Sequence, residues 1–396
     1  MTPPRCQLLP GREKSLLRRH PWVFSGALRD PDAPFAPGET VLLCDAKDRP
    51  LALAAWSPES QLRARVWSFD PTAVIDREFF RERIAQAVEL RRSLGFLDPA
   101  GGCRLIYSES DGLPGFVADL YAGFAVLQCT GAGAERFRDL FAELLMELPF
   151  IRGVYERSDA PVRDKEKLDR RSGMLAGETL PDEVRFTENG LTFAADLRKG
   201  QKTGFYFDLR EVRRTVREFA AGRRTLNVFA YTGGFAVAAL AGGAASVLNI
   251  DSSAPALRQA AVNLELNGFD SNWENRCGDA FQILRELDAA GEKFDLIVLD
   301  PPKLIPGRSA LIRGCRGYQD LARMGFRLLN PSGVLVNLSC SGLMDASLFQ
   351  KITADAALEA GRTARIVRRL EQAADHPTSL NVPETFYLKG LVSVAE

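Results

Sequence analysis

The sequence predicts an α/β protein in three parts: a small β-rich domain over residues 1–72, a central α+β domain over 73–185, and a Rossmann-like domain over 186–396. Three observations support this prediction. Short apolar segments separated by Pro, Gly and Asp turns fill the first 70 residues. Amphipathic helices and strands mix in the middle of the chain. From about residue 186, apolar strands alternate with helices, which indicates a parallel sheet covered on both faces.

In the first two domains, strands and helices are predicted from the spacing of apolar residues and from turn residues. In the β-rich domain we expect strands at 41–44, 51–56 and 62–69. In the central domain we expect helices at 76–94 and 134–148, two strands within 104–121 around a turn at 111–115, and a strand at 153–156. The charged segment 157–177 is predicted to be irregular.

The third domain alternates regularly. Strands are expected at 225–230, 246–250, 273–276, 294–299, 334–338, 364–370 and 386–392. Helices are expected at 235–241, 254–266, 280–289, 318–329 and 346–360. Residues 225–250 carry no charge over 26 residues, which is long enough to span a membrane. Because two Gly pairs, Asn227 and Asn249 interrupt this stretch, a strand, glycine turn, helix and second strand fit it better than a membrane span.

Composition excludes several classes of protein. The 396 residues hold 51 Lys and Arg against 51 Asp and Glu, so the formal net charge is zero. This balance argues against coating nucleic acid through bulk charge, although basic residues can still gather on one face. Seven cysteines without close spacing and two histidines argue against a zinc site, so no metal is predicted. The N-terminus has no signal-peptide pattern, and we expect a cytoplasmic protein without a membrane segment.

A glycine loop follows the first strand of the third domain. Tyr231, Thr232, Gly233 and Gly234 permit a tight turn in which a ligand can approach backbone N–H groups. Asp251 lies 17 residues after Gly234, at the end of the second strand, where a carboxylate can accept hydrogen bonds from a ribose. The loop is not a GxGxxG motif, and its spacing suits NAD and S-adenosylmethionine (SAM) alike. A purely structural turn also remains open.

Two further strand ends carry polar residues. Asp279, before Ala280, suits either an adenine contact or a helix cap. The fourth strand ends in Asp300-Pro301-Pro302-Lys303, and the two prolines make a stiff corner that holds Asp300 at the strand end. Such a corner positions a flat nucleobase against a methyl donor, whereas hydride transfer does not require it.

Cys340 follows the fifth strand between Ser339 and Ser341. A thiolate there can add to C6 of cytosine and make C5 nucleophilic, while Asp300 protonates the N3 edge. The alternative is that Cys340 is a small buried hydrophobic residue, as free cysteines often are. Cys277, at the end of the third strand, is expected to be structural, and Cys315 is expected in a Gly/Arg loop.

Several segments together resemble the bacterial 23S rRNA (cytosine-5)-methyltransferases with an N-terminal PUA domain. They are GREKSLLRRHPWVFSGAL near the start, QKTGFYFDLR at 201–210, FAYTGGFAVAAL, LDPPK and LSCSGLM. The resemblance spans nearly the whole chain. It implies a PUA domain, a central domain and a class I SAM-methyltransferase domain, with SAM as cofactor and 23S rRNA as partner. Because a cytosine inside a paired helix would have to be extruded, we expect RNA that is single-stranded or free of ribosomal proteins.

The resemblance also implies site residues. The predicted catalytic residues are Cys340 as nucleophile, Asp300 and Lys303. It adds Phe205 and Arg210 as residues that frame the cofactor. The predicted cofactor-binding set is Phe205, Arg210, Tyr231, Thr232, Gly233, Gly234, Asp251, Ser252, Asp279, Ala280, Asp300 and Pro301.

Two positions depart from the family pattern. Gln201 stands where the family usually has His, which puts a proton-carrying role there in doubt, although Gln can still donate and accept hydrogen bonds. Related RNA m5C enzymes often carry a second cysteine beside the fourth-strand proline. Here that place is Pro301-Pro302-Lys303, so product release cannot depend on such a residue.

Basic residues concentrate in three stretches. Lys and Arg exceed Asp and Glu by six to two in 1–30, by nine to three in 198–224 and by four to none in 303–318. The alternatives are a solvated loop for 303–318 and a solvated helix face along most of 210–224. Trp22 and Phe24 are expected in the core. The predicted RNA-binding residues are Arg12, Lys14, Arg18, Arg19, Lys202, Arg308, Arg313 and Arg316.

The sequence therefore predicts a SAM-dependent enzyme that forms 5-methylcytosine at a specific cytosine of 23S rRNA through a Cys–C6 covalent intermediate. Two alternatives stay open: an rRNA purine N-methyltransferase that uses the DPPK corner without a covalent step, and a non-catalytic RNA-binding ribosome assembly factor. A nicotinamide oxidoreductase fits least well. The target nucleotide is not identified, and a homodimer is left open.

Overall fold

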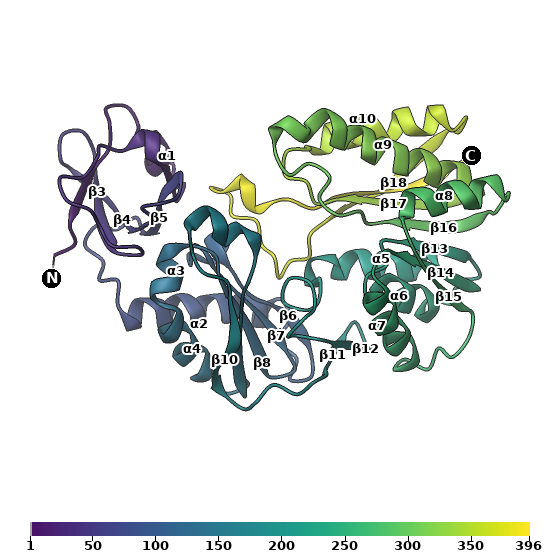
Figure 1. Cartoon of the computed structure of the whole chain (residues 1–396), viewed down its shortest axis with the longest axis horizontal. Coiled ribbons are helices and arrows are strands. Elements are labelled where there is room, and N and C mark those ends of the chain that lie inside the picture. Colours follow the sequence, from purple (N-terminus) through teal and green to yellow (C-terminus); the bar gives the residue numbers. More distant parts are fainter. Residues whose placement is uncertain (1) are drawn as a thin grey trace. The chain divides into compact units, whose positions relative to one another are not determined.

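The computed structural model describes residues 2–396, which pack into two compact units (Figure 1). Unit 1 runs to Phe186 and also includes Ala195–Phe207 and Ala374–Thr385. Unit 2 comprises Thr187–Ala194, Asp208–Ala373 and Phe386–Glu396. Each unit therefore contains segments that are distant in the sequence, while the domain boundaries at residues 72 and 185 stay predictions.

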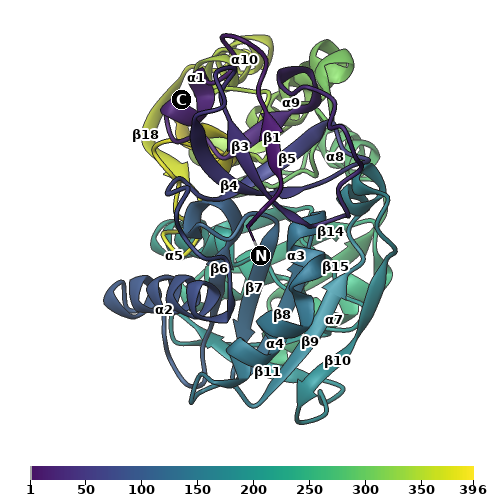
Figure 2. The same cartoon turned by 90° about the vertical axis from the view of Figure 1, so that its left-hand side faces the viewer.

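A five-stranded sheet opens unit 1 (Figure 2). Its order is β1-β3-β4-β5-β2, with β1 parallel to β3 and the other neighbours antiparallel. The elements are β1 (Arg5–Gln7), α1 (Lys14–Leu17), β2 (Trp22–Phe24), η1 (Ser25–Ala27), β3 (Thr40–Cys44), β4 (Pro50–Trp56) and β5 (Leu62–Ser68). The three predicted strands are confirmed. Strands β1 and β2 are too short, at three residues each, to show periodicity.

A second five-stranded sheet follows in unit 1, in the order β10-β9-β8-β7-β6. Its strands are β6 (Gly102–Tyr107), β7 (Phe116–Tyr121), β8 (Phe124–Cys129), β9 (Gly153–Ser158) and β10 (Arg171–Gly177). The helical elements beside it are α2 (Arg77–Ser93), η2 (Ser108–Asp111), α3 (Ala132–Arg136), α4 (Arg138–Met146) and η3 (Pro161–Glu166). The helix predicted at 134–148 is thus divided, and the division falls at Phe137.

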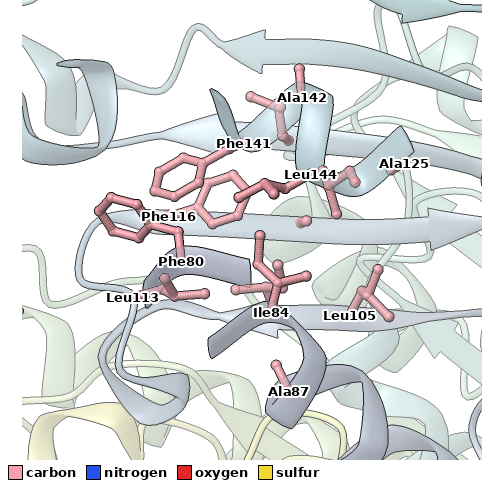
Figure 3. Packing of buried hydrophobic residues seen from close by; sticks show 14 of the residues in the cluster. Phe80, Ile84, Ala87, Leu105, Leu113, Phe116, Ala125, Phe141, Ala142 and Leu144 are labelled. Carbon is pink, nitrogen blue, oxygen red and sulfur yellow. The ribbon is translucent and has the colours of Figure 1, made fainter. Parts of the chain in front are cut away.

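Aromatic and aliphatic side chains from α2, α4 and this second sheet form the core of unit 1 (Figure 3). Phe116 of β7 stacks on Phe141 of α4 with ring centroids 4.1 Å apart. Phe80 of α2 meets Phe141 edge to face. Ala55 and Trp67 of the N-terminal sheet are buried in the same cluster, which joins the two sheets into one unit.

The segment 157–177 was expected to be irregular, and this prediction is wrong. It holds η3 and the edge strand β10, which pairs antiparallel with β9 from Arg171 opposite Ser158. Most β10 side chains are exposed or half-buried, so the strand lacks apolar alternation. Backbone pairing with β9, which no local pattern announces, makes this segment a strand.

Unit 2 is built around a seven-stranded sheet in the order β15-β14-β13-β16-β17-β19-β18. Its strands are β13 (Arg224–Val228), β14 (Ser246–Asp251), β15 (Trp273–Cys277), β16 (Phe294–Leu299), β17 (Leu329–Ser339), β18 (Ala364–Glu371) and β19 (Lys389–Ala395). Its helices are α5 (Arg210–Phe219), α6 (Gly234–Ala241), α7 (Ala254–Glu265), α8 (Ala280–Ala289), α9 (Leu311–Leu328) and α10 (Ala346–Glu359). Unit 2 also holds η5 (Arg308–Ala310). Three further elements contain residues of both units: β11 (Val184–Glu188), β12 (Leu191–Ala195) and η4 (Phe207–Leu209). The last element, η6 (Pro383–Thr385), belongs to unit 1.

The Rossmann-like arrangement is confirmed. Helices α8, α9 and α10 contribute to a buried cluster on one face of the sheet, and α5, α6 and α7 lie against the other (Figure 1). The uncharged stretch 225–250 forms β13, α6 and β14 as predicted. No helix among the described residues is long and apolar enough to cross a membrane.

Two details of unit 2 differ from the prediction. The sheet is not wholly parallel, because β19 inserts antiparallel between β17 and β18. The chain between β18 and β19 holds only the short η6, and the two strands pair as antiparallel neighbours. Helix α9 begins at Leu311 rather than 318, so Arg313, Cys315 and Arg316 are helical. Gly314 and Gly317 are poor helix formers, so the sequence did not predict that the helix begins before residue 318.

The helix expected to be solvated over 210–224 also differs. It ends at Phe219, and Arg224 belongs to β13. Arg210 and Arg213 are buried near Glu188, with Arg213 Nη2 donating to Glu188 Oε2 at 2.7 Å. A partner on a distant hairpin therefore changes a charged face into a buried ion pair.

Candidate active site at the ends of the parallel strands

Parallel pairing brings the carboxyl ends of the central strands of unit 2 to one edge of the sheet. Val228 of β13 lies opposite Ile250 of β14 and Leu299 of β16. Leu299 in turn lies opposite Asn337 of β17. The segments that follow these strands contain the glycine loop, Asp251, Asp300 and Cys340, so the sheet places the predicted site residues of unit 2 along one edge.

The glycine loop has an unusual backbone. Gly233 precedes α6 with φ of +78°, and a Cβ there would lie 2.8 Å from Ala260 Cβ of α7. Glycine is therefore required for both conformation and close packing. Phe229 and Tyr231 adopt φ of 64° and 47°, which is costly for residues with large side chains. Such strain concentrates at binding sites, where the surrounding structure maintains it.

Asp251 organises this loop. Its Oδ2 accepts a hydrogen bond from Tyr231 N and its Oδ1 accepts one from Ser253 N, both at 2.8 Å. The residue is half-buried. A carboxylate has about four lone-pair sites, so these two bonds leave acceptor capacity toward a ligand hydroxyl.

Asp279 is exposed and caps α8, because its Oδ1 accepts a hydrogen bond from Gln282 N at 2.9 Å. This contact bears out the cap that the sequence left as an alternative. Ala280 is the buried first residue of α8, and Ser252 is exposed beside Asp251. A cofactor contact for these three residues stays a prediction.

The corner after β16 is tied to the loop after β17. Asp300 is half-buried, Pro301 is buried and Lys303 is exposed. Ile305 N donates to Ser341 Oγ at 3.3 Å, and Ser341 Oγ shares a 2.9 Å hydrogen bond with Tyr318 Oη. A Cβ on Gly314 would lie 2.3 Å from Ile305 Cγ1, so this glycine lets α9 approach the corner closely.

Cys340 is half-buried, between the fully buried Ser339 and Ser341. Buried Lys389 anchors the same loop, since its Nζ donates to Ser341 O at 2.7 Å and to Met344 O at 2.8 Å. Burial lowers the pKa of Lys389 to about 8, while Cys340 acts in the opposite direction. Burial also raises the pKa of Tyr318, and Cys340 adds to that shift. The ionisable side chains of Lys389 and Tyr318 are therefore electrostatically coupled to Cys340.

The other cysteines have varied surroundings. Burial raises the pKa of Cys6 to about 12 and that of Cys129 well above its usual value. Cys315 packs half-buried on α9, where burial raises its pKa. Cys277, expected to be structural, is exposed, and its Sγ donates to Ser252 O at 3.6 Å.

Sequence reasoning missed Tyr318, Ser341 as a linking residue, and Lys389. No local pattern marks Tyr318 within α9. Lys389 did carry a signal, since it is a single charged residue at the start of the otherwise uncharged run GLVSVA. A lysine that enters a buried strand requires compensating partners.

Two predicted cofactor residues have other surroundings. Phe205 lies in unit 1 and is buried, with its N–H donating to Tyr121 Oη at 2.9 Å and its ring 5.0 Å from that of Phe186. In the same segment, Gln201 accepts a hydrogen bond from Tyr206 Oη at 2.8 Å. Arg210 is buried in unit 2 near Glu188. Cofactor roles for Phe205 and Arg210 stay predictions.

The predicted RNA-binding residues are all exposed. Arg12, Lys14, Arg18 and Arg19 lie on and around α1 in unit 1, which also contains Lys202. Arg308, Arg313 and Arg316 lie on η5 and α9 in unit 2. Phe24, expected in the core, is 53% exposed and lies on the edge strand β2. Trp22 is half-buried and donates to Glu109 Oε1 at 2.9 Å.

Among residues 2–396, no group of three or more His, Cys, Asp or Glu side chains is placed to hold a metal ion.

Comparison with known proteins places these features in a family. Residues 159–391 match the model of S-adenosylmethionine-dependent methyltransferases, and residues 7–69 match a PUA-like domain. The ribosomal RNA large subunit methyltransferase I of Aeromonas salmonicida is 50% identical over 386 residues, 97% of this chain and 98% of that protein. The protein of the same name from Erwinia tasmaniensis is 47% identical over 387 residues, 98% of each chain.

Solved structures show the same fold. A Streptococcus mutans protein assigned as a SAM-dependent methyltransferase has a TM-score of 0.84 at 22% identity and covers 99% of this chain and 100% of its own. A second structure, assigned as a methyltransferase and complexed with SAH, has the same TM-score and identity and covers 100% of both chains.

Proposed function

The chain belongs to the ribosomal RNA large subunit methyltransferase I family of S-adenosylmethionine-dependent enzymes, and from this premise we propose that it forms 5-methylcytosine at one cytosine of 23S rRNA through a covalent adduct on Cys340. The observation that carries the proposal is the half-buried Cys340 at the end of β17. Its loop is hydrogen-bonded through Ser341 to the corner after Asp300. A thiol and a carboxyl at adjacent strand ends suit addition to a pyrimidine ring.

The edge of the sheet fits SAM. Asp251 retains acceptor capacity for ribose hydroxyls, and the glycine loop before α6 lets a ligand approach the backbone. Asp279 at the next strand end suits the adenine edge. Bound SAM supplies an electrophilic methyl group on a sulfonium centre. These residues, with Phe205, Arg210 and the rest of the predicted set, are proposed to hold the cofactor.

The covalent route assigns a step to each catalytic group. The Cys340 thiolate adds to C6 of cytosine and forms a C–S bond. The C5–C6 π electrons shift to C4–C5 as Asp300 donates a proton to N3, which leaves an enamine. With SAM bound, C5 would take the methyl carbon while the sulfonium C–S bond breaks and S-adenosylhomocysteine leaves. A base then removes the C5 proton, the electrons of that C–H bond form the C5–C6 double bond again, and the sulfur leaves as thiolate. N3 returns its proton to Asp300. Lys303 is exposed, and its proposed role is to meet the negative charge of the nucleotide's phosphate.

The substrate is proposed to be large-subunit rRNA free of ribosomal proteins. A cytosine must leave its stacked position to reach a thiol at a strand end, and single-stranded or unprotected RNA makes this easier. The exposed arginines of η5 and α9 follow the DPPK corner in sequence and suit contacts to phosphates.

Cys340→Ala tests the covalent route. With radiolabelled SAM and protein-free 23S rRNA, we expect this variant to lose at least about 100-fold in methyl transfer, since nucleophilic activation contributes on this scale. Cys315→Ala, a half-buried cysteine on α9, serves as the matched control and keeps activity within about twofold. Mass spectrometry of the labelled nucleoside identifies 5-methylcytosine.

A trapping experiment adds an independent readout. In RNA with 5-fluorocytidine at the target, C5 carries no proton to remove, so the wild-type enzyme remains attached to RNA on a denaturing gel. Full transfer by Cys340→Ala, with methyl on a purine nitrogen, would favour the N-methyltransferase alternative that uses the DPPK corner. No incorporation by the wild-type protein at any salt concentration would favour a binding factor.

A further inference from the structure

Lys389 is a buried lysine beside the loop that carries Cys340. It is the first residue of β19 and pairs with Ser339, the last residue of β17. Only 5% of it is exposed. Its backbone is fixed by pairing on both sides, because β19 lies between β17 and β18 in the sheet.

Two contacts define what the side chain does. Nζ donates to the carbonyl oxygens of Ser341 and Met344, at 2.7 and 2.8 Å. These carbonyls lie in the turn just after Cys340, which also contains the Met344 N to Ser341 O hydrogen bond at 3.0 Å. An ammonium has three N–H bonds, so one remains for a further acceptor after the two carbonyls are bonded.

The charges around Lys389 favour a thiolate as that acceptor. Burial lowers the pKa of Lys389 to about 8, and the opposing effects come first from Cys340 and then from Asp345, while Lys303 lowers it further. Glu371 lies opposite Lys389 on β18 and is exposed, and Tyr318 faces Cys340 from α9. Since electrostatic coupling is mutual, an ammonium favoured by a nearby thiolate also favours that thiolate.

Resting on the proposed role of Cys340 as nucleophile, we propose that Lys389 is a positioning residue for it: the ammonium fixes the 340–344 loop through two carbonyls and holds the Cys340 sulfur as thiolate. At neutral pH the lysine is mostly protonated, because its pKa lies near 8. In this proposal Lys389 acts through Cys340 and not by contact with the cytosine or the cofactor.

Alkylation of Cys340 tests this role without measuring methyl transfer. Iodoacetamide is added over a range of pH, and mass spectrometry follows the peptide that contains Cys340. Cys277, exposed at the end of β15, is the internal reference thiol. Lys389→Gln keeps two N–H donors for the carbonyls and removes the positive charge. Lys389→Arg keeps the donors and the charge. Comparing the two variants therefore separates the effect of the charge from the effect of the hydrogen bonds to the loop.

We expect Lys389→Gln to reduce the Cys340 alkylation rate about tenfold at pH 7. Loss of a nearby positive charge raises the pKa of a thiol by about one or more, so a smaller fraction of Cys340 is thiolate. The difference should vanish above about pH 9, where wild-type Lys389 has lost its proton and free thiols ionise. Lys389→Arg should stay within about threefold of wild type. A Lys389→Gln rate equal to wild type would overturn the proposal and leave Lys389 as an anchor only.

If a variant unfolds, Cys340 and the normally buried Cys129 should be alkylated at equal rates. In that case the pH profile of the wild-type chain provides the test. In the wild-type chain Cys340 should reach half its maximal rate at lower pH than Cys277, and the reverse order would overturn the proposal. If the covalent mechanism is wrong, Cys340→Ala will still transfer methyl groups. That outcome is separate from the alkylation result, which it does not change.

Discussion

The carboxylate of Asp251 connects the fold to the proposed cofactor site. It bonds to the backbone of Tyr231 and Ser253, and so holds a loop in which Phe229 and Tyr231 have positive φ. The sequence predicted Asp251 from its place at a strand end. It did not predict the strained backbone, because αL residues with large side chains follow no pattern and persist only when surrounding contacts hold them.

Asp251→Ala should weaken SAM binding about 10- to 100-fold, because bonds to a charged group contribute about 1.5–3 kcal/mol. Isothermal titration with SAM or SAH measures this change. Asp251→Asn keeps one acceptor oxygen and should bind with intermediate affinity. Asp295→Asn is the matched control, since that carboxylate bonds to Arg224 N at the opposite end of the sheet. Unchanged affinity in Asp251→Ala would place the cofactor elsewhere.

Three strands of unit 2 are linked by asparagine side chains. Asn227 of β13 donates to Asn249 of β14 at 2.8 Å, and Asn249 donates to Asn275 of β15 at 3.0 Å. Asn275 then donates to Leu257 O of α7 at 2.9 Å. In the sequence, Asn227 and Asn249 only argued against a membrane span, and Asn275 carried no prediction. The parallel register puts all three in line and makes them a chain of amides in which Asn227 and Asn249 are fully buried.

Asn249→Leu should destabilise this part of the sheet by about 1–3 kcal/mol, because Asn227 and Asn275 each lose a buried partner. Hydrogen exchange of the β13 and β14 amides is the suitable measurement, since a chain of two units need not unfold in one step. Asn381→Leu, at an exposed position, is the control and should leave exchange unchanged. Equal protection in both variants would show that the amide chain does not stabilise the sheet.

Elements with a strong apolar period were predicted well, and those without one were not. Strands β13, β14 and β16 and helix α8 lie where expected. The strands are short apolar runs, and the buried side chains of α8 recur at the period of a helix. The edge strand β10 and the first turn of α9 were missed. Their structure depends on a distant strand and on glycines that fit against the 304–305 segment.

Across the whole chain, the zero net charge conceals an uneven distribution. The basic residues around α1 and those of η5 and α9 are exposed, whereas several arginines elsewhere form buried ion pairs, such as Arg213 with Glu188. Exposed basic residues therefore include those that the sequence predicted to contact RNA, while part of the basic charge is neutralised by buried partners. This pattern suits an enzyme that must bind one RNA segment and then release it.

Replacing Arg12 and Arg18 with Ala should weaken binding of protein-free 23S rRNA and reduce the slope of log K against log salt by about 1.4–1.8, the value for two phosphate contacts. Filter binding over a series of KCl concentrations measures both effects. Arg365→Ala with Arg369→Ala removes the same charge from β18 and should leave the slope unchanged. Equal slopes in the two double variants would exclude the α1 surface from RNA binding.

The sequence by itself determined the α/β fold, the strand ends at which Asp251, Asp300 and Cys340 stand, and the family resemblance. These features depend on local periodicity and on residues that follow a strand directly. Only the tertiary structure decided what surrounds Cys340. Lys389 and Ser341 are 48 residues apart, and they meet because β19 inserts antiparallel beside β17. Pairing between distant strands depends on the whole sheet, so no local sequence pattern can predict it.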